Sequence, residues 1–209
     1  MGMGLGMRIT TGKYKGRNIA MPKGIRPTQD KVRKAIFDIL GDIEGLSFLE
    51  LYAGSGAVGF EALSRGASEA VMVEYNRDCQ LAIKENIETL KDNACSLYPH
   101  EAEKAIFWLH KNGRRFDIIF LDPPYYVGNT FRVLQVPQGV SLAKKTLQTL
   151  GAYDILSPNG LVIAQHFKRD ELPEECGQLV LVKEAKYGDT VLSIYRKEHV
   201  SGSDISRNI

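Results

Sequence analysis

The chain has 209 residues, of which 44% are hydrophobic and 25% are charged. That composition is typical of a globular domain and excludes disordered, collagen-like and disulfide-framework chains. No stretch approaches the roughly 18 apolar residues that a membrane span needs, and the three cysteines and four histidines lack zinc-site spacing. We therefore expect a cytoplasmic monomer that binds no membrane and no metal.

Basic residues are concentrated at the N-terminal end of the chain. The whole chain has a net charge of +2, yet residues 1–34 contain nine Lys or Arg and one acid. The rest of the chain is therefore net acidic. A basic segment at one end suits a phosphate backbone, although charge alone fits a solvated basic surface equally well.

The basic segment is expected to contain a short hairpin or an extended lead-in, followed by a helix. Apolar and polar residues alternate in the runs 7–10 and 17–20, which predicts the hairpin or lead-in. Between Thr28 and Gly41 apolar residues recur with helical spacing, so a helix capped by Thr28 is predicted there. We assign residues 1–40 to a basic N-terminal extension.

Beyond the extension, predicted strands and helices alternate. The expected strands are 46–52, 70–74, 94–98, 116–121 and, after a turn at 157–160, 160–164. The expected helices are 57–65, 78–90, 102–110 and a segment that ends at 150. This alternation predicts a parallel sheet, and the strongly apolar run 116–121 is typical of a central strand buried on both faces.

The last two predicted strands differ from the others. The runs 178–183 and 190–196 lie too close together for a crossover helix, which predicts an antiparallel pair at the end of the sheet. Residues 41–200 are therefore expected to form one doubly wound α/β domain with a mostly parallel sheet. Residues 126–140 predict a long loop, and residues 201–209 a flexible tail.

A glycine-rich turn follows the first strand of this domain. Residues 54–59 read G-S-G-A-V-G, a G-x-G-x-x-G pattern whose glycines let the backbone turn sharply and approach a cofactor. Glu74 ends the next strand, where a carboxylate can accept both hydroxyls of an adenosine ribose. A tight turn and a surface acid without a ligand would also explain these residues. The strand context, the glycines and the acid together favour a nucleotide-like cofactor.

Two cofactors fit this pattern, the nicotinamide dinucleotide of a reductase and the S-adenosylmethionine of a methyltransferase. Glu50, four residues before Gly54, would repel a pyrophosphate but attract the methionyl ammonium of S-adenosylmethionine. An ordinary strand-end acid also explains Glu50, so this residue favours the methyl donor only modestly.

A second motif, D-P-P-Y at residues 122–125, follows the apolar strand 116–121. The exocyclic amino group of a base is a poor nucleophile because its lone pair is delocalised into the ring. Hydrogen bonds to the Asp122 carboxylate and the Pro123 carbonyl would direct that lone pair at the methyl group, and Tyr125 would stack on the base. The motif therefore predicts an amino-methyltransferase, with a Pro-Pro surface loop as the structural interpretation.

Several segments together resemble the RsmD family of ribosomal-RNA methyltransferases. They are the two motifs above, R-P-T-Q-D-K-V-R-K-A-I-F at 26–37, E-A-L-S-R-G-A at 61–67 and Y-G-D-T at 187–190. The resemblance implies the Rossmann-like class I methyltransferase fold and methyl transfer from S-adenosylmethionine to the N2 amino group of a guanine in 16S rRNA. Its partner would be 16S rRNA or the small ribosomal subunit.

The resemblance also implies roles for individual residues. It places catalysis at Asp122, Pro123 and Tyr125. It places cofactor contacts at Glu50, Gly54, Ser55, Gly56, Glu74, Glu101 and Asp122. Glu50 and Glu101 stand where Asp is expected, and Gln165 stands where an acid usually ends the fifth strand of the family's sheet.

The basic extension is the predicted rRNA-binding surface. We expect its phosphate contacts at Arg8, Lys13, Lys15 and Arg17. The alternatives are an amino-methyltransferase that acts on another base, because DNA enzymes also carry D-P-P-Y, a dinucleotide-dependent reductase, and a non-catalytic RNA-binding relative. The intact Asp122 and Tyr125 argue against the last of these.

Overall fold

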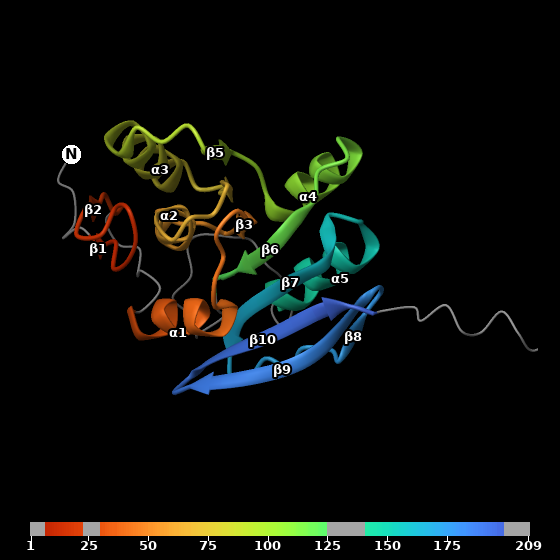
Figure 1. Cartoon of the computed structure of the whole chain (residues 1–209). Helices are drawn as coiled ribbons and strands as arrows, with labels where there is room; N and C mark the ends of the chain where they lie inside the picture. The colour runs from red at the N-terminus through yellow and green to blue at the C-terminus, as the bar shows by residue number, and fades with distance from the viewer. Residues whose placement is uncertain (1–6, 23–29, 125–140, 199–209) are drawn as a thin grey trace, which may run out of the picture.

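The computed structural model describes residues 7–22, 30–124 and 141–198 (Figure 1). The strands are β1 (Met7–Arg8), β2 (Asn18–Ile19), β3 (Ser47–Leu51), β4 (Glu69–Val73), β5 (Cys95–Tyr98), β6 (Phe116–Leu121), β7 (Leu156–Phe167), β8 (Glu175–Cys176), β9 (Leu179–Tyr187) and β10 (Thr190–Lys197). The helices are α1 (Asp30–Leu40), α2 (Ala57–Ser64), α3 (Arg77–Leu90), α4 (Ala102–Lys111) and α5 (Leu142–Ala152). The predictions for Thr28, Tyr125, the 126–140 loop and the tail lie outside the described residues.

Eight strands form the central sheet in the order β5-β4-β3-β6-β7-β10-β9-β8. The first five of these run parallel, whereas β10 pairs antiparallel with both β7 and β9. The predicted parallel sheet and its antiparallel final pair are therefore confirmed. β6 occupies 116–121 as predicted, and because it lies between β3 and β7 its side chains are buried on both faces.

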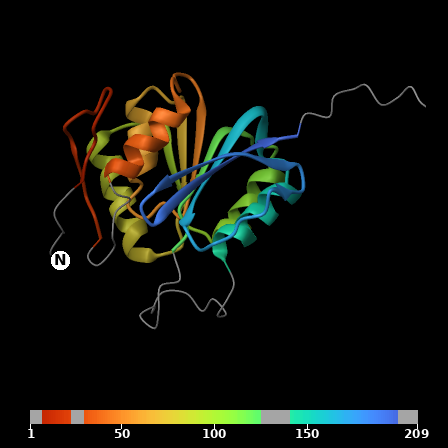
Figure 2. The same cartoon turned by 90° about the horizontal axis from the view of Figure 1, so that it is seen from below.

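Helices cover both faces of this sheet (Figure 2). Buried residues of α1, α2 and α3 pack with Phe48, Phe120 and Ile163 on one face. Those of α4 and α5 pack with Leu49, Leu121 and other strand residues on the opposite face. The alternation of the two clusters along β3 and β6 follows from the two-residue period of a strand. No helix in the described residues is long and apolar enough to cross a membrane.

β7 is longer than the sequence predicts. The predicted turn at 157–160 lies inside the strand, because Phe116 pairs with Leu156 and Ile118 pairs with Leu161. The four residues between those pairs form an irregularity in the β6–β7 ladder. One residue of β6 therefore faces four residues of β7, so the S-P-N-G segment bulges out of the ladder and the strand continues on both sides of it.

The N-terminal hairpin packs against α2 and α3. Ile9 and Ile19 join the same buried cluster as α1, so residues 7–40 have no separate core among the described residues. Thr10 donates through its backbone N–H and its hydroxyl to Glu61, at 2.8 and 2.6 Å. Asn86 exchanges hydrogen bonds with the backbone of Ala20. The division of the chain at residue 40 stays a prediction.

Candidate active site

The candidate site lies at the carboxyl ends of β3 and β6. From β3 the chain crosses to β4 on one side, whereas from β6 it crosses to β7 on the other side. In open α/β sheets ligands bind in the crevice at such a change of direction. The predicted motifs meet there, because the glycine-rich turn follows β3 and Asp122 follows β6, with the Asp122 N–H 3.4 Å from the Leu51 carbonyl.

The glycine-rich turn has one packed face and one open face. Gly54 and Gly56 have φ values of 57° and 78°, which favour glycine. A Cβ on Gly56 would lie 2.5 Å from the Met72 sulfur and 2.8 Å from a Phe60 ring carbon. A Cβ on Gly54 would meet no atom within 4 Å. The turn therefore packs against the core at Gly56, while Gly54 faces space that a ligand can occupy.

Glu50 lies buried under this turn. Its Oε2 accepts a hydrogen bond of 2.8 Å from the Gly59 N–H, in the first turn of α2. A Cβ on Gly59 would lie 2.8 Å from the same oxygen, so the third glycine of the motif makes room for this carboxyl group. Desolvation raises the pKa of Glu50 to about 8, against the opposing effect of the α2 N–H groups. Its predicted contact with a methionyl ammonium stays a prediction.

Glu74 closes the turn from the neighbouring strand. Its two carboxylate oxygens accept 2.7 Å hydrogen bonds from the N–H groups of Gly54 and Asn76. Burial raises its pKa, with these N–H groups opposing the shift. Each carboxylate oxygen has a second lone pair, so the same group can still accept the hydroxyls of a ribose. The predicted ribose acid therefore lies beside the turn that would carry the cofactor.

Tyr52 is a site residue to which the sequence analysis gave no role. Its φ of 61° is unusual for a residue with a side chain and occurs directly before the glycine-rich turn. Its hydroxyl lies 2.7 Å from Thr146 Oγ1 on α5, and Thr146 reaches Glu103 on α4 at 3.4 Å. Desolvation raises the pKa of Tyr52. These contacts tie the turn to the helices of the opposite layer.

The remaining predicted site residues occupy the same edge at different depths. Asp122 is half-buried, Pro123 is buried, and Ser55 is 4% exposed on the packed side of the turn. Glu101 precedes α4, past the end of β5, and pairs with Lys104 at 3.0 Å. Gln165 is buried near the end of β7.

The predicted RNA-binding residues lie on the hairpin. Lys13 pairs with Asp92 at 2.8 Å, and this contact raises the pKa of Lys13. Arg17 donates to the Thr89 carbonyl at 3.4 Å and Arg8 donates to the Asn18 side chain at 3.3 Å, whereas Lys15 is exposed. Lys13, Arg17 and Arg8 therefore already make ion-pair or hydrogen-bond contacts within the protein.

Arg33 shows that the basic charge of the extension is not all at the surface. Its side chain is 2% exposed and donates to the Arg8 carbonyl and to Asp30, both at 3.0 Å. Its Nε lies 3.9 Å from the buried Glu61, which also pairs with Arg65 at 3.0 Å. This network fixes the hairpin to α1 and α2.

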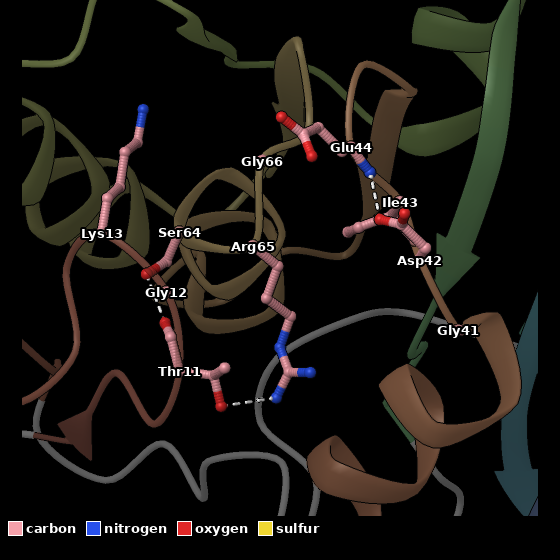
Figure 3. Close-up of a pocket in the computed structure, with 10 residues that line it drawn as sticks. All are labelled: Thr11, Gly12, Lys13, Gly41, Asp42, Ile43, Glu44, Ser64, Arg65 and Gly66. Atoms are coloured by element: carbon pink, nitrogen blue, oxygen red, sulfur yellow. Dashed lines mark hydrogen bonds between the residues drawn. The ribbon is translucent and has the colours of Figure 1, made fainter.

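A cavity of about 450 Å³ lies away from the predicted site, between the hairpin, the segment before β3 and the end of α2 (Figure 3). Arg65 donates to the Thr11 hydroxyl at 3.0 Å, and the Asp42 carboxylate accepts from the Glu44 N–H at 3.0 Å. The strand ends that carry the two motifs are at the other edge of the sheet, so we place the candidate active site there.

Within the described ranges no group of three or more His, Cys, Asp or Glu could hold a metal ion.

Known proteins are similar to this chain in sequence and in fold. "Putative rRNA methyltransferase YlbH" of Bacillus subtilis is 35% identical over 195 residues, which are 91% of this chain and 99% of that protein. "Ribosomal RNA small subunit methyltransferase D" of Escherichia coli is 29% identical over 201 residues, which are 95% and 93% of the two chains.

Among solved structures, the "Putative methyltransferase yhhF from Escherichia coli" superimposes with a TM-score of 0.73 at 28% identity. The match covers 94% of this chain and 99% of that one, which confirms the predicted class I methyltransferase fold. Residues 7–196 match the family described as "Conserved hypothetical protein 95". The chain therefore belongs to this family, which is the RsmD family that its motifs resemble.

Proposed function

We propose that this protein transfers a methyl group from S-adenosylmethionine to the N2 amino group of a guanine in 16S rRNA. The observation that carries the proposal is the position of Asp122 and Pro123 at the end of β6, next to the glycine-rich turn that follows β3. Membership of the RsmD family supports rRNA as the substrate.

The residues at the turn fit S-adenosylmethionine. Glu50, Glu74 and Asp122 gather carboxyl groups around the turn, and Asp122 and Glu74 both add to the raised pKa of Glu50. Carboxylates at Glu74 and Asp122 would attract the sulfonium and ammonium groups of this cofactor and repel the pyrophosphate of a dinucleotide. Glu50, whose pKa is about 8, adds negative charge when a bound cation favours its ionised form. The open face of Gly54 and the lone pairs of Glu74 would hold the amino-acid and ribose parts. When bound, the cofactor supplies an electrophilic methyl group.

The protein's own contribution is to position the amino group. The Asp122 carboxylate and the Pro123 carbonyl would each accept one N–H of the guanine amino group. With both N–H bonds held, the nitrogen lone pair points toward the methyl group, and the reaction gains from proximity and orientation. Pro123 is buried and is followed by Pro124, so packing and the restriction that Pro124 places on the ψ of Pro123 both limit the direction of the Pro123 carbonyl.

The hairpin would bind rRNA phosphates at a distance from the target base, beside the end of α2 that is remote from the site. The Lys13 N–H binds the Ser64 carbonyl at 2.8 Å, at the end of α2 remote from the glycine-rich turn. An eight-residue helix is about 12 Å long, so a phosphate at the hairpin tip lies more than one nucleotide from the target base. Exposed Lys15 is best placed for such a contact.

The proposal is tested by methylation of 16S rRNA and of small subunits from a bacterium that lacks the activity. The purified protein is incubated with each substrate and radiolabelled S-adenosylmethionine, and the labelled nucleotide is mapped and digested to nucleosides. We expect N2-methylguanosine at one position. Label on another base would support the broader amino-methyltransferase, and NAD(H) binding without methylation would support the reductase.

A further inference from the structure

The side-chain oxygen of Gln165 is buried and has no hydrogen-bond partner among the described residues. The residue is 5% exposed, and its Oε1 is the buried side-chain oxygen or nitrogen that lacks a partner among the described residues. Such atoms are rare in folded proteins because an unpaired buried acceptor costs about as much as a lost hydrogen bond. The missing donor is therefore a feature that needs an explanation.

The sheet register places Gln165 beside Asp122. Leu121 of β6 pairs with Ala164 of β7, and this is the last pair of that ladder. Asp122 directly follows β6 and Gln165 continues β7, so the register, extended by one residue, sets the two at the same level. Two residues earlier, Phe120 and Ile163 both pack in the cluster under α1–α3. By the two-residue period of a strand, Asp122 and Gln165 project to that same face, on strands that lie about 4.8 Å apart.

The two residues would therefore face neighbouring groups of a base. In guanine the N2 amino group is flanked by the ring N1–H, which is a donor. The ring nitrogen beside the amino group of adenine or cytosine is an acceptor instead. An acceptor next to Asp122 consequently matches guanine and opposes the other two bases.

We infer that Gln165 selects guanine by accepting a hydrogen bond from its N1–H through Oε1. This inference rests on the proposed function, since it concerns the same base and the same site. A neutral amide supplies the acceptor without adding another carboxylate next to Asp122. Rotation of the amide also offers an N–H to an acceptor nitrogen, which limits the selectivity of glutamine compared with a carboxylate.

The test compares three proteins on two substrates. Wild type, Gln165→Glu and Gln165→Met are given 16S rRNA into which a synthetic segment has been ligated. The segment carries guanine or 2-aminopurine at the position methylated by the wild type. Both bases have the 2-amino group, but N1 of 2-aminopurine is an acceptor and not a donor. The measured quantity is the methylation rate with guanine divided by the methylation rate with 2-aminopurine.

We expect the ratio to be largest for Gln165→Glu, intermediate for wild type and smallest for Gln165→Met. Removal of the amide should lower guanine methylation about 10- to 100-fold. It should lower 2-aminopurine methylation by a smaller factor, because only a rotated amide donates to N1 of that base. If Gln165 had only a structural role, its replacement would lower the methylation rates of both bases by the same factor. Equal ratios in the three proteins, with guanine still methylated, would overturn the inference.

The controls separate this inference from the proposed function. If wild type puts no label on guanine N2, the proposed function fails, whatever the ratios are. Gln148→Met makes the same replacement at an exposed position of α5 and should leave both rates unchanged. Thermal melting identifies a variant that does not fold, and in that case the comparison of Gln165→Glu with wild type still decides.

Discussion

The carboxyl edge of the sheet and the N-terminal hairpin use charge in opposite ways. At the edge, Glu50 and Glu74 accept hydrogen bonds from backbone N–H groups, which bring no full positive charge. On the hairpin, Lys13 is paired with the carboxylate of Asp92. Among the described residues no cation pairs with either acid, so these carboxyl groups remain available to a cationic cofactor, although Glu50 holds a proton near neutral pH because its pKa is about 8. On the hairpin, in contrast, part of the basic charge is used to hold the fold.

This difference explains why net charge was a weak guide to function. The nine basic residues of the N-terminal segment include Arg33, which is buried against Asp30 and near Glu61. In contrast, the acidic edge lies in a chain whose net charge is +2. Placement and burial, not the total, decide what a charge can bind.

Asp122→Ala should show the largest effect, because it removes the group that positions the amino nitrogen. Loss of one preorganised partner typically costs about 10²–10³ in rate. We expect that loss in single-turnover methylation, with the dissociation constant of S-adenosylmethionine changed by only severalfold in calorimetry. Near-normal turnover would show that the acidic edge serves the cofactor alone.

Glu50→Gln tests whether burial of an acid has a cost in stability. The pKa of Glu50 is about 8 in the folded protein and near 4.5 when exposed. Between those values the folded state keeps a proton that the unfolded state releases, so stability falls as pH rises. The loss is about 2–3 kcal/mol between pH 5 and 7.

The measurement is urea unfolding of wild type and Glu50→Gln across that pH range. Glu74 also has a raised pKa and contributes in the same direction, so its share remains in both proteins. The difference between the two curves isolates Glu50. Parallel curves would mean that Glu50 is ionised in the folded protein and is compensated by the N–H groups of α2.

Glu74→Ala should weaken cofactor binding more than it slows the saturated reaction. Hydrogen bonds to a charged acceptor act in the ground and transition states alike, and their loss raises the dissociation constant about 10- to 100-fold. Because Glu74 also holds the Gly54 N–H, Glu74→Gln is the matched variant that keeps an acceptor oxygen. Calorimetry should place it between wild type and Glu74→Ala. An unchanged affinity in both variants would mean that the ribose is held elsewhere.

Most strands of the central sheet and the motif positions could be predicted because they depend on local patterns, whereas β8 and the first residues of β7 were missed. The apolar run 116–121 and the glycines at 54 and 56 needed no knowledge of distant residues. The contact between Lys13 and Asp92 joins residues far apart in the chain, so no local pattern indicates it. The contact of the Tyr52 hydroxyl with Thr146 on α5 likewise joins distant residues, and no local pattern indicates it.

The hairpin prediction has the smallest effect and separates free cations from engaged ones. Each phosphate contact on single-stranded RNA contributes about −0.7 to the slope of log affinity against log salt. Replacing Lys13, Lys15 and Arg17 together with Ala should flatten the slope by about two units if all three make contact. The single variant Lys15→Ala should account for about 0.7 of that change, because Lys15 is exposed.

Lys13→Ala gives the sharper comparison, because the Lys13 ammonium lies 2.8 Å from Asp92 and its pKa is raised. A cation that is already paired releases fewer counterions from RNA, so its replacement should change the slope less than Lys15→Ala does. Lys84→Ala, at an exposed position of α3, is the matched control and should leave the slope unchanged. Equal effects of Lys13→Ala and Lys15→Ala would mean that Lys13 leaves Asp92 when RNA binds, because both would then contact phosphates. An unchanged slope in every variant would assign the hairpin to the fold, because its cations would then make no measurable contact with RNA.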